Sequence, residues 1–243
     1  MEGRRAVAGN TATGVLKLAA LALMAADHAG QALFPGVIEL RLIGRVAFPL
    51  YAWCLVVGFE RTRSVPRYLG RMALLGLVSQ PLYVLAMGRD WTEPNILLTL
   101  CLALCALWGI RENRGLSRWW APALALVLAY LLKCDYDVRG ILLVLLIYVL
   151  RGNRGALAAG LTLFCLLWGV DSMPLNFIFG QRIHLKGALL PLLSPWLRVQ
   201  CFAALSVPLI VCRFPGDIRM PAWLGYGLYP AHLLVLYLLD CCL

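Results

Sequence analysis

Charged residues are scarce in this chain. Asp, Glu, Lys and Arg make up only 14% of its 243 residues, whereas they make up about a quarter of an ordinary soluble domain. Hydrophobic residues reach 62%. This composition argues against an ordinary soluble enzyme and predicts a protein whose helices cross a lipid bilayer several times.

The chain also lacks the residue patterns from which metal and haem centres are built. It has three histidines, and its nine cysteines fall mostly inside apolar runs, without the spacing of zinc, iron–sulfur or disulfide sites. We interpret the cysteines as small hydrophobic residues and expect no metal and no haem. The first apolar run is not followed by a signal-peptide cleavage pattern, so we interpret it as an uncleaved helix.

Apolar runs bounded by charged and turn residues predict an all-α fold, a polytopic transmembrane bundle of about nine helices, with eight to ten as the range. In this interpretation residues 1–243 form one membrane domain, and residues 1–14 form a flexible cytoplasmic tail. The stretch 173–195 contains a short apolar run broken by Pro191, so we expect either a re-entrant or interfacial segment or a hidden tenth helix. The predicted helices span residues 15–34, 40–60, 68–88, 95–111, 119–133, 138–150, 156–172, 196–212 and 222–240.

Basic residues gather on one side of the predicted bundle. The N-terminus and alternate loops hold fourteen Lys and Arg but only four acids, which places the chain's whole net charge of +10 on that side. Such a bias marks the cytoplasmic side, so the N-terminus is cytoplasmic and an odd helix count puts the C-terminus outside. Attraction to lipid headgroups accounts for this charge without a nucleic acid partner. The basic residues are Arg4, Arg5, Lys17, Arg61, Arg63, Arg67, Arg71, Arg111, Arg114, Arg118, Arg151, Arg154, Arg213 and Arg219.

Two ionisable residues, Asp27 and His28, lie side by side within the apolar run Leu18 to Phe34. Ionisable groups at membrane depth are costly and indicate a functional site. His232 is expected near the middle of the last helix, at a similar depth. Further polar residues are expected at the same outer level, which favours one shared cavity. They are Arg41, Arg45, Glu93, Asn95, Lys133, Asp135, Tyr136, Asp137, Arg139, Asp171, Asn176, Gln181, His184, Lys186 and Tyr229.

The role of Asp27 is open at this stage. Asp27 can orient His28 as a general base, or it can form a salt bridge with Arg41 or Arg45. Adjacent helix residues diverge by about 100°, which works against the first role.

Several segments, in this order along nearly the whole chain, resemble the TraX family of membrane proteins. The segments are Leu16–Leu18, Asp27–His28, Leu42–Tyr51 (LIGRVAFPLY), Gly58–Phe59, Thr62–Arg63, Tyr68–Leu69 with Arg71, Asn95–Leu100 (NILLTL), Asp135–Tyr136, Gly140–Leu143 (GILL) and Tyr229–Leu234 (YPAHLL).

This resemblance implies an acetyltransferase in the bacterial cytoplasmic membrane. The named member of the family acetylates the amino terminus of conjugative pilin, and the family is similar to multi-span acyltransferases that use acetyl-CoA. The acceptor is then a pilin amine, a glycan or another small molecule, and a homo-oligomer is compatible with the sequence. His28 would deprotonate the acceptor, with Asp27 and His232 completing the catalytic group.

The resemblance also implies where the substrates bind. Acetyl-CoA would enter from the cytoplasm, with its phosphates on Arg61, Arg63, Arg67 and Arg71, although the positive-inside rule explains the same arginines. Residues expected at the substrate or the oxyanion are Arg41, Arg45, Asn95, Asp135, Tyr136 and Tyr229.

Two other classes of function remain open from the sequence. An intramembrane Asp with histidines and arginines could form the path of a proton-coupled membrane transporter. The two halves of the chain do not repeat each other's polar positions, whereas inverted repeats are common in such transporters. A non-catalytic membrane scaffold would leave Asp27 and His28 without a purpose.

Overall fold

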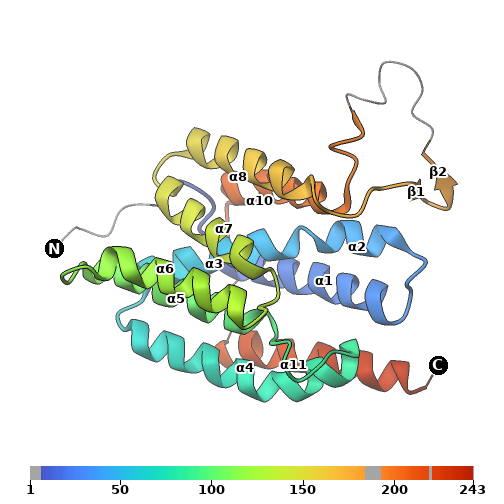
Figure 1. Ribbon diagram of the computed structural model, residues 1–243, viewed down its shortest axis with the longest axis horizontal. Helices are drawn as coiled ribbons and strands as arrows, with labels where there is room; N and C mark the ends of the chain where they lie inside the picture. The colour runs from blue at the N-terminus through green and yellow to red at the C-terminus, as the bar shows by residue number, and fades with distance from the viewer. Residues whose placement is uncertain (1–6, 184–192, 219–220, 243) are drawn as a thin grey trace.

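The computed structural model describes residues 7–183, 193–218 and 221–242, and it is almost entirely helical (Figure 1). All nine predicted helical positions are confirmed as helix, so the all-α class is correct. The predicted helix 40–60 is divided into α2 and α3, and the predicted helix 196–212 into a 3₁₀ segment, η1, and α10. The helices are α1 (Thr13–Ala32), α2 (Ile38–Gly44), α3 (Ala47–Arg61), α4 (Val65–Met87), α5 (Ile96–Glu112), α6 (Ser117–Leu131), α7 (Asp137–Leu150), α8 (Arg154–Gly169), η1 (Val199–Leu205), α10 (Ser206–Val211) and α11 (Ala222–Asp240).

Two helical stretches of the described residues are long and apolar enough to cross a membrane. They are Ile38–Arg61, with 24 residues, and Val65–Met87, with 23. Helices α5 to α8 have 14 to 17 residues each, fewer than the roughly 20 that a span through a typical bilayer needs. Multiple membrane crossings therefore stay a prediction.

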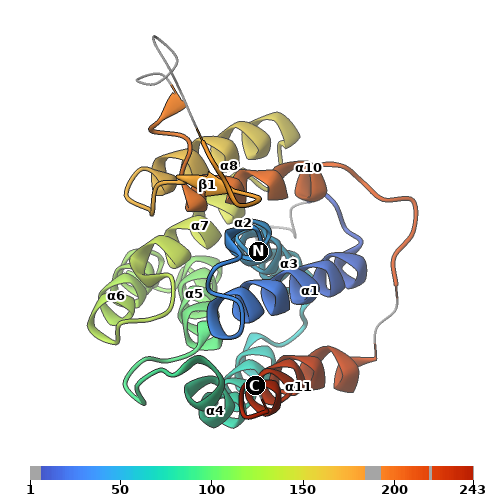
Figure 2. The same cartoon turned by 90° about the vertical axis from the view of Figure 1, so that its right-hand side faces the viewer.

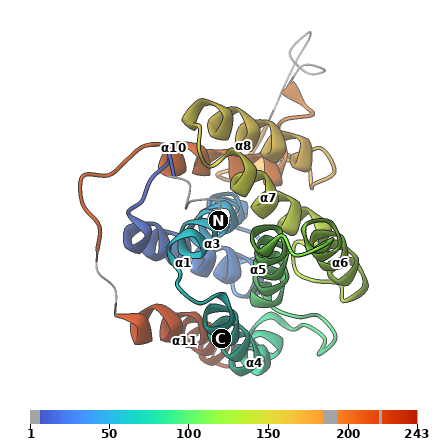
Figure 3. The same ribbon diagram turned by 90° about the vertical axis from the view of Figure 1, so that its left-hand side faces the viewer.

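Helix α3 forms the centre of the bundle. Twelve of its fifteen residues are buried, among them Phe48, Trp53 and Phe59. Seen along the bundle in Figure 2, α1, α5, α7 and α10 surround α3, and α4 and α11 form a pair on one side. Figure 3 shows the same arrangement from the other end. Close van der Waals packing of these large side chains against the neighbouring helices, which acts in water and in lipid alike, helps to hold the bundle together.

The helices alternate in direction, so the loops collect at two ends of the bundle (Figure 1). Loops 62–64, 113–116 and 151–153 lie at one end, called the basic end here because the predicted cytoplasmic arginines flank them. Loops 33–37, 88–95 and 132–136 lie at the opposite end. Helices α1 and α11 run in the same direction, as an odd number of passes requires.

The predicted flexible tail is wrong for residues 7–12. The backbone N–H of Ala8 donates to Arg151 O at 2.8 Å, and that of Asn10 donates to Ile210 O at 2.7 Å. The indole N–H of Trp53 donates to Asn10 O at 2.7 Å, and Asn10 is fully buried. These bonds satisfy backbone groups of a buried segment, so the chain is ordered before α1 begins.

The predicted interfacial segment contains a two-stranded antiparallel hairpin, β1 (Phe177–Ile178) with β2 (Gln181–Arg182). Phe179 and Gly180 form its turn with positive φ, at 48° and 72°. Leu175 packs with Leu42 and Val199 in a small second core. The predictions for His184 and Lys186, and the run interrupted by Pro191, lie outside the described residues.

Candidate functional site

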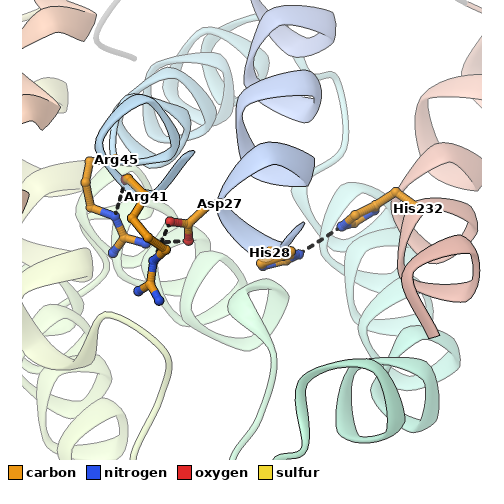
Figure 4. A network of polar contacts seen from close by, with 5 residues as sticks. All are labelled: Asp27, His28, Arg41, Arg45 and His232. Carbon is orange, nitrogen blue, oxygen red and sulfur yellow. Dashed lines mark hydrogen bonds and ion pairs between the residues drawn. The ribbon is translucent and has the colours of Figure 1, made fainter. Parts of the chain in front are cut away.

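The first half of the site is an ion-pair cluster around Asp27. Arg41 Nε donates to Asp27 Oδ1 at 3.0 Å, and the guanidinium of Arg45 pairs with the other carboxylate oxygen (Figure 4). Gly44 makes this approach feasible, because a Cβ there would overlap Asp27. Asp27 is buried, with 7% of its surface exposed. The sequence left open whether Asp27 orients His28 or forms a salt bridge with Arg41 or Arg45, and the structure shows the salt bridge.

The second half of the site is a contact between two histidines. His28 Nδ1 lies 3.1 Å from His232 Nε2, and the two rings are stacked with centroids 5.3 Å apart and planes 15° apart. Figure 4 shows His28 on the side of α1 that faces α11, away from Asp27. The angle of about 100° between adjacent helix residues explains this separation. The partner of His28 is thus His232, which is 204 residues away along the chain.

The hydrogen bonds assign a tautomer to each ring. His232 Nδ1 lies 3.3 Å from the carbonyl oxygen of Leu228, and a carbonyl can only accept, so we place the proton of neutral His232 on Nδ1. Its Nε2 then accepts the Nδ1–H of His28. This leaves Nε2 of His28 with a free lone pair, the feature that a general base requires.

His28 lines a cavity of about 470 Å³, called the polar cavity here. It reaches two of the three loops at the end opposite the basic end, 88–95 and 132–136. Its charged residues are balanced, with four basic and four acidic side chains, which are Arg41, Arg45, Arg89, Lys133, Asp27, Glu93, Asp135 and Asp137. Of the predicted outer residues, Arg139, Asp171, Asn176 and Gln181 do not line this cavity, and Arg139 and Asp171 form an exposed ion pair at 2.7 Å.

Asp135 and Tyr136 enter the polar cavity from the loop between α6 and α7. The ring of Tyr136 stacks on Phe48 with centroids 4.1 Å apart, which fixes the loop against α3. Burial raises the pKa of Asp135 to about 6, although Arg45 and Arg89 oppose the shift. Asp135 forms no ion pair with a described residue.

Asn95 has a structural role. Its side chain accepts from Leu97 N at 3.0 Å and so caps α5, and its amide donates to Gly76 O and Gln80 Oε1. It does not line the polar cavity. Its predicted place at the substrate or the oxyanion came from its expected level in the bundle and from the family resemblance. A polar residue directly before an apolar run is also the signal of a helix N-cap.

The structure places three of the four predicted phosphate-binding arginines at one pocket and the fourth elsewhere. Arg63, Arg67 and Arg71 line a shallow pocket of about 580 Å³ at the basic end, called the arginine pocket here. Arg61 instead donates to Thr11 O at 3.2 Å. The guanidinium of Arg71 lies 6.0 Å from the ring centre of Tyr226, which links this pocket to the next cavity.

A third cavity, called the apolar cavity here, occupies about 360 Å³ between α1, α3, α4 and α11. Lys17 and Asp217 line it towards the basic end, and leucines form much of its wall. Tyr51 and Tyr229 line both this cavity and the polar cavity. The two cavities therefore share a wall formed by these two tyrosines, which we call the tyrosine junction.

Sequence reasoning predicted Tyr229 but missed Tyr51 and Tyr226 as site residues. Tyr51 follows Arg45 and Pro49 on the predicted second helix, and a tyrosine within an apolar run is the signal that could have indicated it. Within residues 7–183, 193–218 and 221–242, no three His, Cys, Asp or Glu side chains come together as a metal site would require.

Comparisons with known proteins agree with the resemblance found in the sequence. The chain is 30% identical over 232 residues to Protein TraX of Escherichia coli, a match that covers 91% of this chain and 84% of that protein. It is 33% identical over 147 residues to the probable fimbrial assembly protein FimC, serogroup H1, of Dichelobacter nodosus, covering 54% of this chain and 59% of that protein. No solved structure matches the chain. The family model described as TraX protein matches residues 12–240, and the chain belongs to this family.

Proposed function

We propose that this protein is an integral-membrane acyltransferase that moves an acetyl group from acetyl-CoA to an amine or hydroxyl acceptor. The observation that carries the proposal is the contact of His28 with His232, at 3.1 Å, beside a polar cavity. A neutral imidazole with a fixed tautomer and a free Nε2 can take the acceptor's proton during attack on a thioester. His232 positions His28 and stabilises its protonated form.

The surface of the bundle supports a membrane location. Large apolar side chains are exposed on several helices, among them Leu77 at 74%, Val149 at 72% and Leu163 at 58%. Large exposed apolar surfaces mark sites of protein or membrane interaction, and lipid chains solvate such side chains well. In this proposal the helices cross the bacterial cytoplasmic membrane with the basic end in the cytoplasm.

The arrangement of the cavities suggests a path for the donor. The arginine pocket lies at the proposed cytoplasmic end, where guanidinium groups suit the phosphates of CoA. Arg71 and Tyr226 connect this pocket to the apolar cavity. Lys17, in the apolar cavity, and His28 are separated by about 16 Å along α1, so an extended pantetheine arm would carry the acetyl group towards the tyrosine junction.

The polar cavity suits an acceptor that arrives from the other side. It contains His28 and reaches the loops at the proposed outer end. A fimbrial assembly protein among the relatives favours a pilin-like amine as the acceptor. A sugar hydroxyl or amine would fit the same balanced set of charges.

Acetyl transfer can be tested directly with the protein purified in detergent or nanodiscs. Labelled acetyl-CoA is supplied with a peptide that has a free amino terminus, an amino sugar or a neutral sugar, one at a time. We expect label to move from CoA to at least one acceptor, with release of one free thiol for each acetyl group. Binding of acetyl-CoA without transfer to any acceptor would argue against this function.

The proposed orientation is tested separately with reporters fused to the C-terminus. An odd number of spans predicts that alkaline phosphatase is active there and that a cytosolic fluorescent reporter is not. The opposite result would show that the number of spans is even.

A further inference from the structure

Two of the donors that the sequence suggested for the substrate or the oxyanion, Arg45 and Asn95, are already engaged in the structure. Arg45 pairs with Asp27 and its Nε lies 3.4 Å from Arg41 O. The side-chain amide of Asn95 donates to Gly76 O and Gln80. A group that stabilises developing charge must be free to bind it at the moment of reaction. Another donor is therefore needed.

Tyr229 has a free donor at the right place. Its side chain is buried, with 6% of the residue exposed, and its hydroxyl has no hydrogen-bond partner among the described residues. A buried hydroxyl without a partner costs about 1–3 kcal/mol, and a ligand bound against this residue would supply the missing acceptor. The side-chain amide nitrogen of Gln200 also lacks a partner, but Gln200 lines only the polar cavity. The hydroxyls of Ser79 and Thr99 lack partners as well, and these residues line neither cavity.

Tyr229 lies between the proposed sites of the acyl donor and the acceptor. It lines both cavities, and with Tyr51 it forms the tyrosine junction. Tyr229 precedes His232 by three residues, so both lie on one face of α11, and their ring centres are 5.3 Å apart. His232 in turn holds His28. The free hydroxyl and the proposed base thus belong to one packed group of rings.

Building on the proposed function, we propose that Tyr229 is a catalytic residue whose hydroxyl donates to the thioester carbonyl oxygen of the acyl donor at the tyrosine junction. The acceptor's nitrogen or oxygen forms a bond to the carbonyl carbon, and the π electron pair moves to the oxygen that Tyr229 holds. His28 Nε2 takes the acceptor's proton. The C–S bond then breaks with its electron pair on sulfur, the carbonyl re-forms, and His28 returns the proton to the CoA thiolate.

The test compares Tyr229→Phe with Tyr237→Phe, a control on the same helix that lines neither cavity. The phenylalanine at 229 keeps the ring and removes only the unpartnered hydroxyl, so we expect thermal stability at least equal to that of the wild-type protein. Acetyl-CoA affinity should fall by no more than the loss of one hydrogen bond. Loss of one oxyanion donor should lower kcat about 10²- to 10³-fold, whereas the control should keep wild-type kcat. Wild-type turnover by Tyr229→Phe would overturn the role of Tyr229 and leave the proposed function intact.

An infrared measurement detects the hydrogen bond itself. The carbonyl band of acetyl-CoA labelled with ¹³C at the carbonyl carbon should move to lower frequency on binding to the wild-type protein and should return towards its solution value in Tyr229→Phe. An unshifted band in the wild-type complex would overturn the assignment even if the variant failed to fold. Absence of acetyl-CoA binding by the wild-type protein would instead overturn the proposed function, and this inference with it.

Discussion

His28 donates to His232 across the interface between α1 and α11, at 3.1 Å. Because His232 also donates to the carbonyl of Leu228, the pair forms a chain of donors that ends at a helix backbone. In the proposed mechanism this relationship makes His232 a positioning residue, and a substitution that keeps a hydrogen-bond acceptor separates this role from simple packing.

The first prediction concerns His232. His232→Leu removes the acceptor for His28 Nδ1–H, so His28 can adopt the wrong tautomer, and we expect kcat to fall about 10²-fold or more. His232→Gln keeps an acceptor oxygen and should recover much of that loss. Steady-state kinetics with acetyl-CoA measures both variants. Equal activity of the Leu and Gln variants would show that His232 only fills space.

The second prediction concerns the Asp27 cluster. Asp27→Asn leaves the buried guanidinium of Arg45 without a counter-charge, and removal of one partner from a buried ion pair costs about 3–5 kcal/mol. We expect a large fall in the thermal denaturation midpoint. Adding Arg45→Gln to Asp27→Asn should restore part of the stability, because the two residues interact directly. Additive losses in the double variant would contradict this pairing.

The separation of Asp27 from His28 shows how far sequence reasoning extends. Hydropathy located the helices because burial in an apolar medium selects long apolar runs. The depth of His28 and His232 followed from their positions along those helices. Their contact depends on the rotation of each helix and on which helices are neighbours. These are tertiary features that the sequence of either helix alone does not fix.

Local signals were ambiguous in other places. Asn95 reads equally as a buried polar residue and as an N-cap, and the structure shows the cap. Residues 7–12 are held in place by backbone hydrogen bonds to Arg151 and Ile210. Both partners lie in distant parts of the chain, so the local sequence does not indicate them. The hairpin at residues 177–182 has strands of two residues each, too short for a periodic pattern.

The third prediction is a pH dependence from Asp135. Burial raises its folded pKa to about 6, above the value of about 3.9 in an unfolded chain. The folded state therefore binds more protons between these values. The stability contributed by Asp135 is present below about pH 4, is lost as the pH rises towards 6, and stays lost above it.

Asp135→Asn removes this titration while it keeps the shape of the side chain. We expect the variant to be more stable than the wild-type protein at pH 7.5 and to lose most of that advantage at pH 4.5. Thermal denaturation of both proteins across this range gives the difference. A difference that does not change with pH would contradict the raised pKa.

The fourth prediction concerns the arginine pocket. Arg63→Ala and Arg67→Ala should each weaken the binding of acetyl-CoA, and the loss should shrink as salt screens the phosphate contacts. Arg114→Ala is the matched control, since Arg114 lies in another loop at the basic end and pairs with Glu112. Calorimetric titration at low and high salt measures the affinities. If all three variants bound acetyl-CoA like the wild-type protein, the arginines would only set the orientation of the chain in the membrane.

The most direct test of the central claim is the turnover of His28→Gln, in which the side chain stays polar but lacks a basic nitrogen. We predict that this variant folds, binds acetyl-CoA with wild-type affinity and transfers acetyl at least about 10²-fold more slowly. Transfer at the wild-type rate by the folded variant would show that His28 is not the base and would contradict the proposed mechanism.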